Sequence, residues 1–138
     1  MSTFEQAGRG GRAWRDDRGS APVEFVLVGV LLTFLTLAVL QLTLALHIRN
    51  TVLDAAAEGA RFGALADNDP ADAGPRTADL IAGAIGGDYA HDILVTEGEW
   101  MGHPSVIVTV RATLPLAGLL GIDRGLEVSG HAARETLD

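Results

Sequence analysis

The sequence predicts an α+β protein in which a long N-terminal helix is followed by a small helix and a three-stranded antiparallel sheet. Three observations predict this fold. Residues 25–46 carry no charged side chain, residues 47–66 place small side chains at helical spacing, and residues 106–114 alternate with a period of two. We therefore expect one helix that crosses a membrane and continues beyond it, followed by a small α+β domain.

Length and composition limit the classes of function. The chain has 138 residues, 10 basic against 18 acidic side chains, a net charge of −8 and no cysteine. That length allows one domain, or one domain with an appendage. An acidic chain lacks the basic face that neutralises phosphates, so we expect no nucleic acid as a partner. Without cysteine there is no disulfide framework and no thiolate ligand for zinc.

Residues 25–46 form a run long enough to cross a lipid bilayer. At 1.5 Å per residue the run is roughly 33 Å long, against about 30 Å for the hydrocarbon core. A buried helix of a soluble domain is the first alternative, but the 92 residues that follow can hardly enclose so long an apolar cylinder. A cleaved signal peptide is the second. A signal peptide has a shorter apolar region, which ends at a cleavage site of the small-x-small type. The end of this run, Leu44–His47, offers no such site.

The charges on either side of the run predict its orientation. Four arginines lie shortly before it and two lie comparably close behind it: Arg9, Arg12, Arg15 and Arg18, then Arg49 and Arg61. Because cytoplasmic flanks are enriched in positive charge, the N-terminus is expected in the cytoplasm. The segment from His47 onward, with 6 Arg and 14 acidic residues, is expected outside the inner membrane.

The junction before the apolar run, Arg18–Phe25, carries the most specific motif. A glycine, a glutamate five residues later and an apolar helix behind them resemble the processing site of type IV prepilins. Together with residues 47–50 and 55–63, the junction is similar to the TadE-like family of tight-adherence (Flp-type) pilus systems. The close resemblance covers about residues 18–66. It implies a pilin-like architecture, cleavage after Gly19 by a prepilin peptidase, and other pilins and Tad assembly proteins as partners.

The same junction has a chemistry of its own. Gly19 lacks a Cβ, so its backbone can enter a narrow protease cleft in an extended conformation. Pro22 suits the first turn of a helix, which places Glu24 at the third helical position, near the positive end of the helix dipole. Glu24 is then either an ordinary first-turn acid or the partner of the new amine at Ser20. In the second interpretation Glu24 and Phe25 take part in assembly with a neighbouring subunit.

Beyond the membrane the helical pattern continues to Ala66. Val52, Ala55, Gly59, Phe62 and Ala66 recur at helical spacing, and Glu58 is spaced to pair with Arg61. The small-residue face permits two interpretations. It packs either on the protein's own domain or against a neighbouring subunit.

The remaining elements are short. Residues 67–75 are turn formers with three aspartates, yet they lack the pattern of a calcium loop. A helix is expected from about Thr77, stopped by Gly86-Gly87, and strands over residues 93–100, 106–114 and 126–132. Gly102-His103-Pro104 is expected to turn the first two strands into a hairpin, and the apolar segment Leu114–Ile122 to cover the core. The buried side of the helix is expected to comprise Leu80, Ile81, Ala84 and Ile85.

No catalytic motif emerges, so we expect neither an enzyme nor a metal or cofactor. The four histidines, His47, His91, His103 and His131, have no ligand spacing. We expect a basic leader over residues 1–19, a transmembrane and stalk helix over 20–66, and an extracytoplasmic domain over 67–138. Two functions stay open. One is a TadE-like pseudopilin or minor pilus component, and the other is a permanent single-pass membrane protein whose outer domain binds a partner in an envelope or secretion complex.

Overall fold

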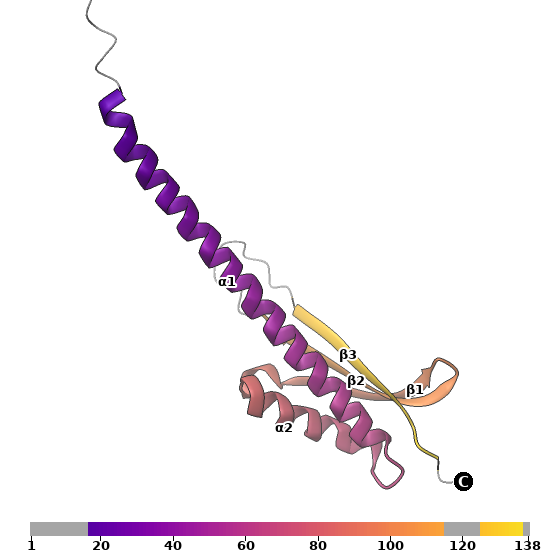
Figure 1. The fold of residues 1–138 in the computed structure, drawn as a ribbon. Coiled ribbons are helices and arrows are strands. Elements are labelled where there is room, and N and C mark those ends of the chain that lie inside the picture. Colours follow the sequence, from indigo (N-terminus) through magenta and orange to yellow (C-terminus); the bar gives the residue numbers. More distant parts are fainter. Residues whose placement is uncertain (1–16, 115–124, 137–138) are drawn as a thin grey trace, which may run out of the picture. The chain divides into compact units, whose positions relative to one another are not determined.

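A computed structural model describes residues 17–114 and 125–136 of the chain (Figure 1). It contains a long helix, a small helix and a three-stranded antiparallel sheet, which confirms the predicted α+β fold class. The elements in chain order are α1 (Asp17–Ala64), η1 (Pro70–Asp72), α2 (Ala73–Ile85), η2 (Gly87–Tyr89), β1 (Asp92–Trp100), β2 (His103–Thr113) and β3 (Gly125–Ala133). Two compact units, Met1–Val39 and Leu40–Asp138, divide the chain within α1.

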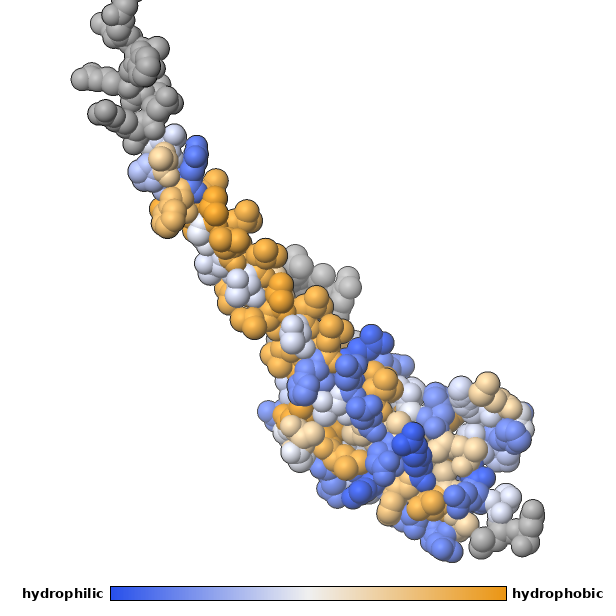
Figure 2. All heavy atoms as spheres, viewed as in Figure 1, coloured by the Kyte–Doolittle hydropathy of each residue, from blue (hydrophilic) through white to orange (hydrophobic). Residues whose placement is uncertain are grey.

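The part of α1 in the first unit exposes its apolar side chains on all sides. Every residue from 19 to 40 is exposed, and Phe25 keeps 80% of its surface accessible. Figure 2 shows a hydrophobic surface along this part of the helix. By length and composition it is able to cross a membrane, and no part of its most apolar window is buried. A helix in the core of a soluble domain would bury that window, so the first alternative from the sequence does not apply.

The part of α1 in the second unit packs on its own domain. Its small residues form a buried face that includes Val52, Ala56, Ala60 and Ala64. Gly59 lies so close to α2 that an added Cβ would be 1.8 Å from Thr77 Oγ1. The structure thus uses this face inside the subunit, where the sequence left the choice between an internal contact and a contact between subunits.

The sheet is a meander in the order β1-β2-β3. Val108 in the central strand faces Val95 on β1 and Gly130 on β3, and all three belong to the side that packs on the helices. Gly130 permits the close approach of β3 to α1, because a Cβ there would be 2.4 Å from the carbonyl carbon of Ala56. On the opposite side the Glu127 carboxylate accepts a hydrogen bond from Arg111 and raises the pKa of that guanidinium.

Four details differ from the sequence-based expectations. The hairpin turn is Met101-Gly102, so His103 and Pro104 already belong to β2. Helix α2 begins at Ala73, because Pro75 is tolerated in a first turn, where its missing N–H has no partner. Ile81 is fully buried as expected, whereas Ala84 is exposed. The fourth difference is the start of α1, which belongs to the candidate site and is described with it.

Most of the segment Leu114–Ile122, which was expected to cover the core, lies outside the described residues.

The loop after α1 and the C-terminal segment donate hydrogen bonds to the last carbonyls of α1. The last carbonyls of a helix have no partner within it. Asn68 Nδ2 donates to the carbonyl of Phe62 at 2.8 Å, and the backbone N–H of Glu135 donates to the carbonyl of Ala64 at 2.9 Å. The chain after β3 is thereby attached to the helix. The expected pair on the outer surface of α1 is also present, with 3.7 Å between Arg61 Nη1 and Glu58 Oε2.

Candidate processing and assembly site

The four residues of the predicted site lie together on the N-terminal part of α1. Gly19, Ser20, Glu24 and Phe25 are all exposed, and an added Cβ at Gly19 would meet nothing within 4 Å. Among the described residues, the Glu24 carboxylate has neither a hydrogen bond nor an ion pair. An unpaired carboxylate therefore borders the apolar run directly.

The start of α1 differs from the prediction. The helix begins at Asp17, five residues before Pro22, and Pro22 lies inside it. Proline has no N–H, so the carbonyl of Arg18 receives no bond from the residue four positions later. The first turn of α1 therefore lacks one backbone hydrogen bond, and this turn contains the Gly19–Ser20 peptide bond.

This change affects the interpretation of Glu24. At the third helical position a carboxylate gains from the helix dipole, but that effect decays within the first turn. Glu24 is the eighth residue of α1, beyond that range. Ser20 and Glu24 are four positions apart, so their side chains lie on the same face of the helix. Chemically, the site offers an acceptor for a cation at the edge of an apolar surface.

A shallow apolar groove on the same unit was missed from the sequence. It has a volume of about 330 Å³ and lies around Gly29, between Val26, Val30, Thr33 and Phe34. The Thr33 hydroxyl donates to the carbonyl of Gly29 at 2.8 Å, so this polar side chain is satisfied within the helix. The four-residue spacing of Gly29 and Thr33 was the signal that could have indicated the groove.

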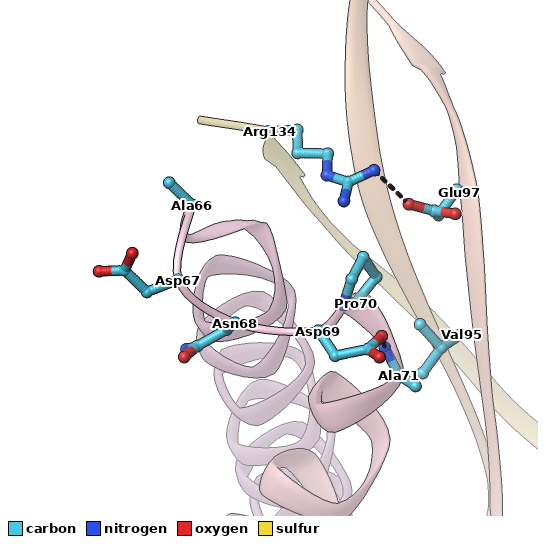
Figure 3. Close-up of a pocket in the computed structure, with 9 residues that line it drawn as sticks. All are labelled: Ala66, Asp67, Asn68, Asp69, Pro70, Ala71, Val95, Glu97 and Arg134. Carbon is cyan, nitrogen blue, oxygen red and sulfur yellow. Dashed lines mark hydrogen bonds and ion pairs between the residues drawn. The ribbon is translucent and has the colours of Figure 1, made fainter. Parts of the chain in front are cut away.

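A second groove, of about 700 Å³, lies in the outer domain between the turn after α1 and the sheet (Figure 3). Arg134 Nη1 donates to Glu97 Oε1 at 2.8 Å inside it. Asp69 belongs to its rim and accepts a hydrogen bond from the N–H of Ala71. Within residues 17–114 and 125–136, no group of three or more histidine or acidic side chains is arranged to hold a metal ion.

The exposed apolar helix, the carboxylate before it and the small domain that follows define a class of protein. In this class a long N-terminal helix, apolar enough to cross a membrane, precedes a small α+β domain in the chain. The family model described as TadE-like protein matches residues 19–61. Over this segment the chain is similar to TadE-like proteins, which confirms the resemblance noted in the sequence. The comparisons with curated proteins and with solved structures gave no match.

The matched segment contains the whole candidate site and the complete apolar run. Together, the family match and the apolar helix fit a membrane protein associated with a Tad pilus system. TadE-like proteins are structural components of such pili and not enzymes. The match ends three residues before the C-terminus of α1, so it does not describe the outer domain.

Proposed function

We propose that the protein is a TadE-like pseudopilin or minor component of a tight-adherence type IV pilus system. A prepilin peptidase cleaves it after Gly19, and the helix that follows anchors it in the inner membrane. The basic leader, residues 1–19, lies in the cytoplasm, and the domain of residues 67–138 lies outside. Its other partners are pilins and Tad assembly proteins.

The observation that carries this proposal is the unpaired Glu24 carboxylate directly before an exposed apolar helix. Placing a charge in a bilayer without a partner is unfavourable, by about 2.5–3.5 kcal/mol at the centre and less at the edge. The amine of Ser20, released by cleavage in a neighbouring subunit, would offset that cost and fix the register between subunits. The family match over residues 19–61 supports the same assignment.

The mature N-terminus tests the processing step. In cells that carry the peptidase, the intact mass of the membrane-extracted protein should correspond to residues 20–138, with or without a methylated amine. A matched variant, Gly19→Leu, should insert normally and stay uncleaved. The added side chain has open space in the fold and would be excluded only from a narrow protease cleft. Recovery of the wild-type chain with residues 1–19 still attached would contradict the proposal.

A second function, a permanent single-pass membrane protein with a partner-binding outer domain, has one observation in its favour. The Gly19–Ser20 bond lies within a helix, whereas a protease cleft takes an extended chain. Cleavage must therefore first unwind the turn that begins at Asp17. The mass measurement distinguishes the two functions, because only the permanent membrane protein keeps its leader.

A further inference from the structure

The turn between β1 and β2 holds an unusual residue. It consists of Met101 and Gly102, with backbone φ angles of 54° and 83°. Positive φ angles are typical of tight hairpin turns and favour Asn and Gly, because a larger side chain crowds the backbone there. Among the described residues, Met101 is the one position outside glycine with a positive φ. Its side chain is 85% exposed, so no packing within the domain compensates for the strain.

A partly exposed apolar surface lies beside the turn. Trp100 is half-buried, and its ring meets that of His131 edge to face, with 4.9 Å between the centroids. A shallow cavity of about 230 Å³ lies beside Met101, with Trp100, His131 and Ser105 among its lining residues. The turn forms the free end of the β1–β2 hairpin in this domain (Figure 1). We name residues Trp100–His103 the hairpin tip.

Charge near the hairpin tip limits what can cover it. Glu99 is exposed and has no hydrogen bond or ion pair among the described residues, whereas Glu97 is bound by Arg134. From His47 onward the chain carries 14 acidic residues against 6 arginines. A second copy of the same domain and an anionic lipid surface would both repel it. A protein with a basic border would attract it.

We propose that the hairpin tip is a docking element for another protein. Met101 enters an apolar pocket of that partner, Trp100 forms the supporting surface, and Glu99 faces Lys or Arg side chains on the border of the pocket. Strained residues are retained where they serve a function, and unbranched methionine adapts well to irregular pockets. The proposal goes beyond the pilus assignment, and it holds whether or not residues 1–19 are removed.

Photocrosslinking in the native cells tests it on the full chain. With a photoreactive amino acid in place of His103, which is exposed beside the turn, we expect one discrete adduct with a different protein. Peptide mapping should place the crosslink next to Lys or Arg residues of the partner. The yield should fall at least tenfold with Met101→Asn, fall strongly with Glu99→Lys, and persist with Met101→Leu.

Stability measurements separate docking from folding. Because Asn accepts a positive φ, Met101→Asn should raise the melting temperature of the detergent-solubilised protein by about 2–5 °C while it abolishes the adduct. The matched control, Leu65→Asn, removes another exposed apolar side chain of the same domain and should leave the adduct unchanged. An adduct with a second copy or with lipid, no adduct at all, or an equal yield in Met101→Asn would each overturn the proposal.

Discussion

The role that can be assigned to Glu24 depends on where α1 begins. Counted from Pro22, it is a first-turn acid that the helix dipole stabilises. Counted from Asp17, it is the eighth helical residue, and the dipole contributes little there. Its carboxylate has no partner among the described residues and borders an apolar surface. We therefore propose that this charge interacts with another subunit.

Substitution of Glu24 tests this explanation. Glu24→Ala should leave membrane insertion and cleavage intact, because the apolar run and Gly19 are unchanged, and it should abolish incorporation into the pilus or its assembly complex. Glu24→Gln should have the same effect, since it keeps the shape and removes the charge. Cell fractionation measures membrane insertion, and the intact mass of the protein measures cleavage. Recovery of the protein in material sheared from the cell surface measures assembly.

Normal assembly of the two Glu24 variants would also be informative. An ordinary first-turn acid would contribute only about 0.3–1 kcal/mol to the helix. Such a loss is too small to prevent assembly, so normal assembly of both variants would refute the pairing of Glu24 with a neighbouring amine.

Among the elements, α1 and α2 depend on a contact between small residues. Gly59 on α1 leaves room for Thr77 on α2, whose hydroxyl donates to the carbonyl of Ala73 at 2.8 Å. One turn further, a Cβ at Gly63 would be 2.8 Å from the Cβ of Ala73. The two helices thus approach closely over two turns, and this contact supports the face of α1 that the sheet covers.

Gly59→Ala should lower the free energy of unfolding of the outer domain by about 1–3 kcal/mol, because the new methyl group displaces Thr77 from its buried position. Gly83→Ala is the control on α2, where a Cβ meets nothing within 4 Å. That change should raise the free energy of unfolding by about 0.5–1 kcal/mol, since alanine favours a helix more than glycine. Urea unfolding followed by circular dichroism measures both. Equal effects of the two substitutions would be inconsistent with a close helix contact.

For the whole molecule, the distribution of charge predicts the orientation in the membrane. The arginines before the apolar run predict a cytoplasmic N-terminus, and the acidic segment behind it contains no basic cluster that would oppose export. The orientation stays a prediction that follows from the charges alone.

Reporter fusions test it directly. A reporter that is active only outside the cytoplasm should be active when fused after Asp138 and inactive when fused after Arg18. Removal of the basic flank by Arg9→Gln, Arg12→Gln, Arg15→Gln and Arg18→Gln should reduce the activity of the first fusion, because the charge difference across the run is then lost. The reverse pattern in the unaltered chain would show that the segment from His47 onward lies in the cytoplasm.

The sequence by itself determined the features that depend on local order. The uncharged run of residues 25–46 predicted a transmembrane helix, and the structure has an exposed apolar helix there. The period of two over residues 106–114 predicted a strand, in which the structure buries Val106, Val108 and Val110. The junction from Gly19 to Phe25 predicted the candidate site, which stays a prediction, and contributed to the TadE-like resemblance that the match over residues 19–61 confirms. Each of these follows from the spacing of side chains along a single element, which the residue order states directly.

Only the tertiary structure decided which surfaces meet. Val52 and Ala56 could equally have faced another subunit, yet both are buried on the domain. At Ala56 the close packing depends on Gly130, more than 70 residues later. The strain at Met101 was equally invisible, because the turn was expected one residue further along. Partners distant in the sequence impose the close approach of Gly130 to α1, and the pairing of β1 with β2 fixes which residues form the turn at Met101. Local periodicity cannot identify those partners, since small residues suit many surfaces and only the folded chain selects one.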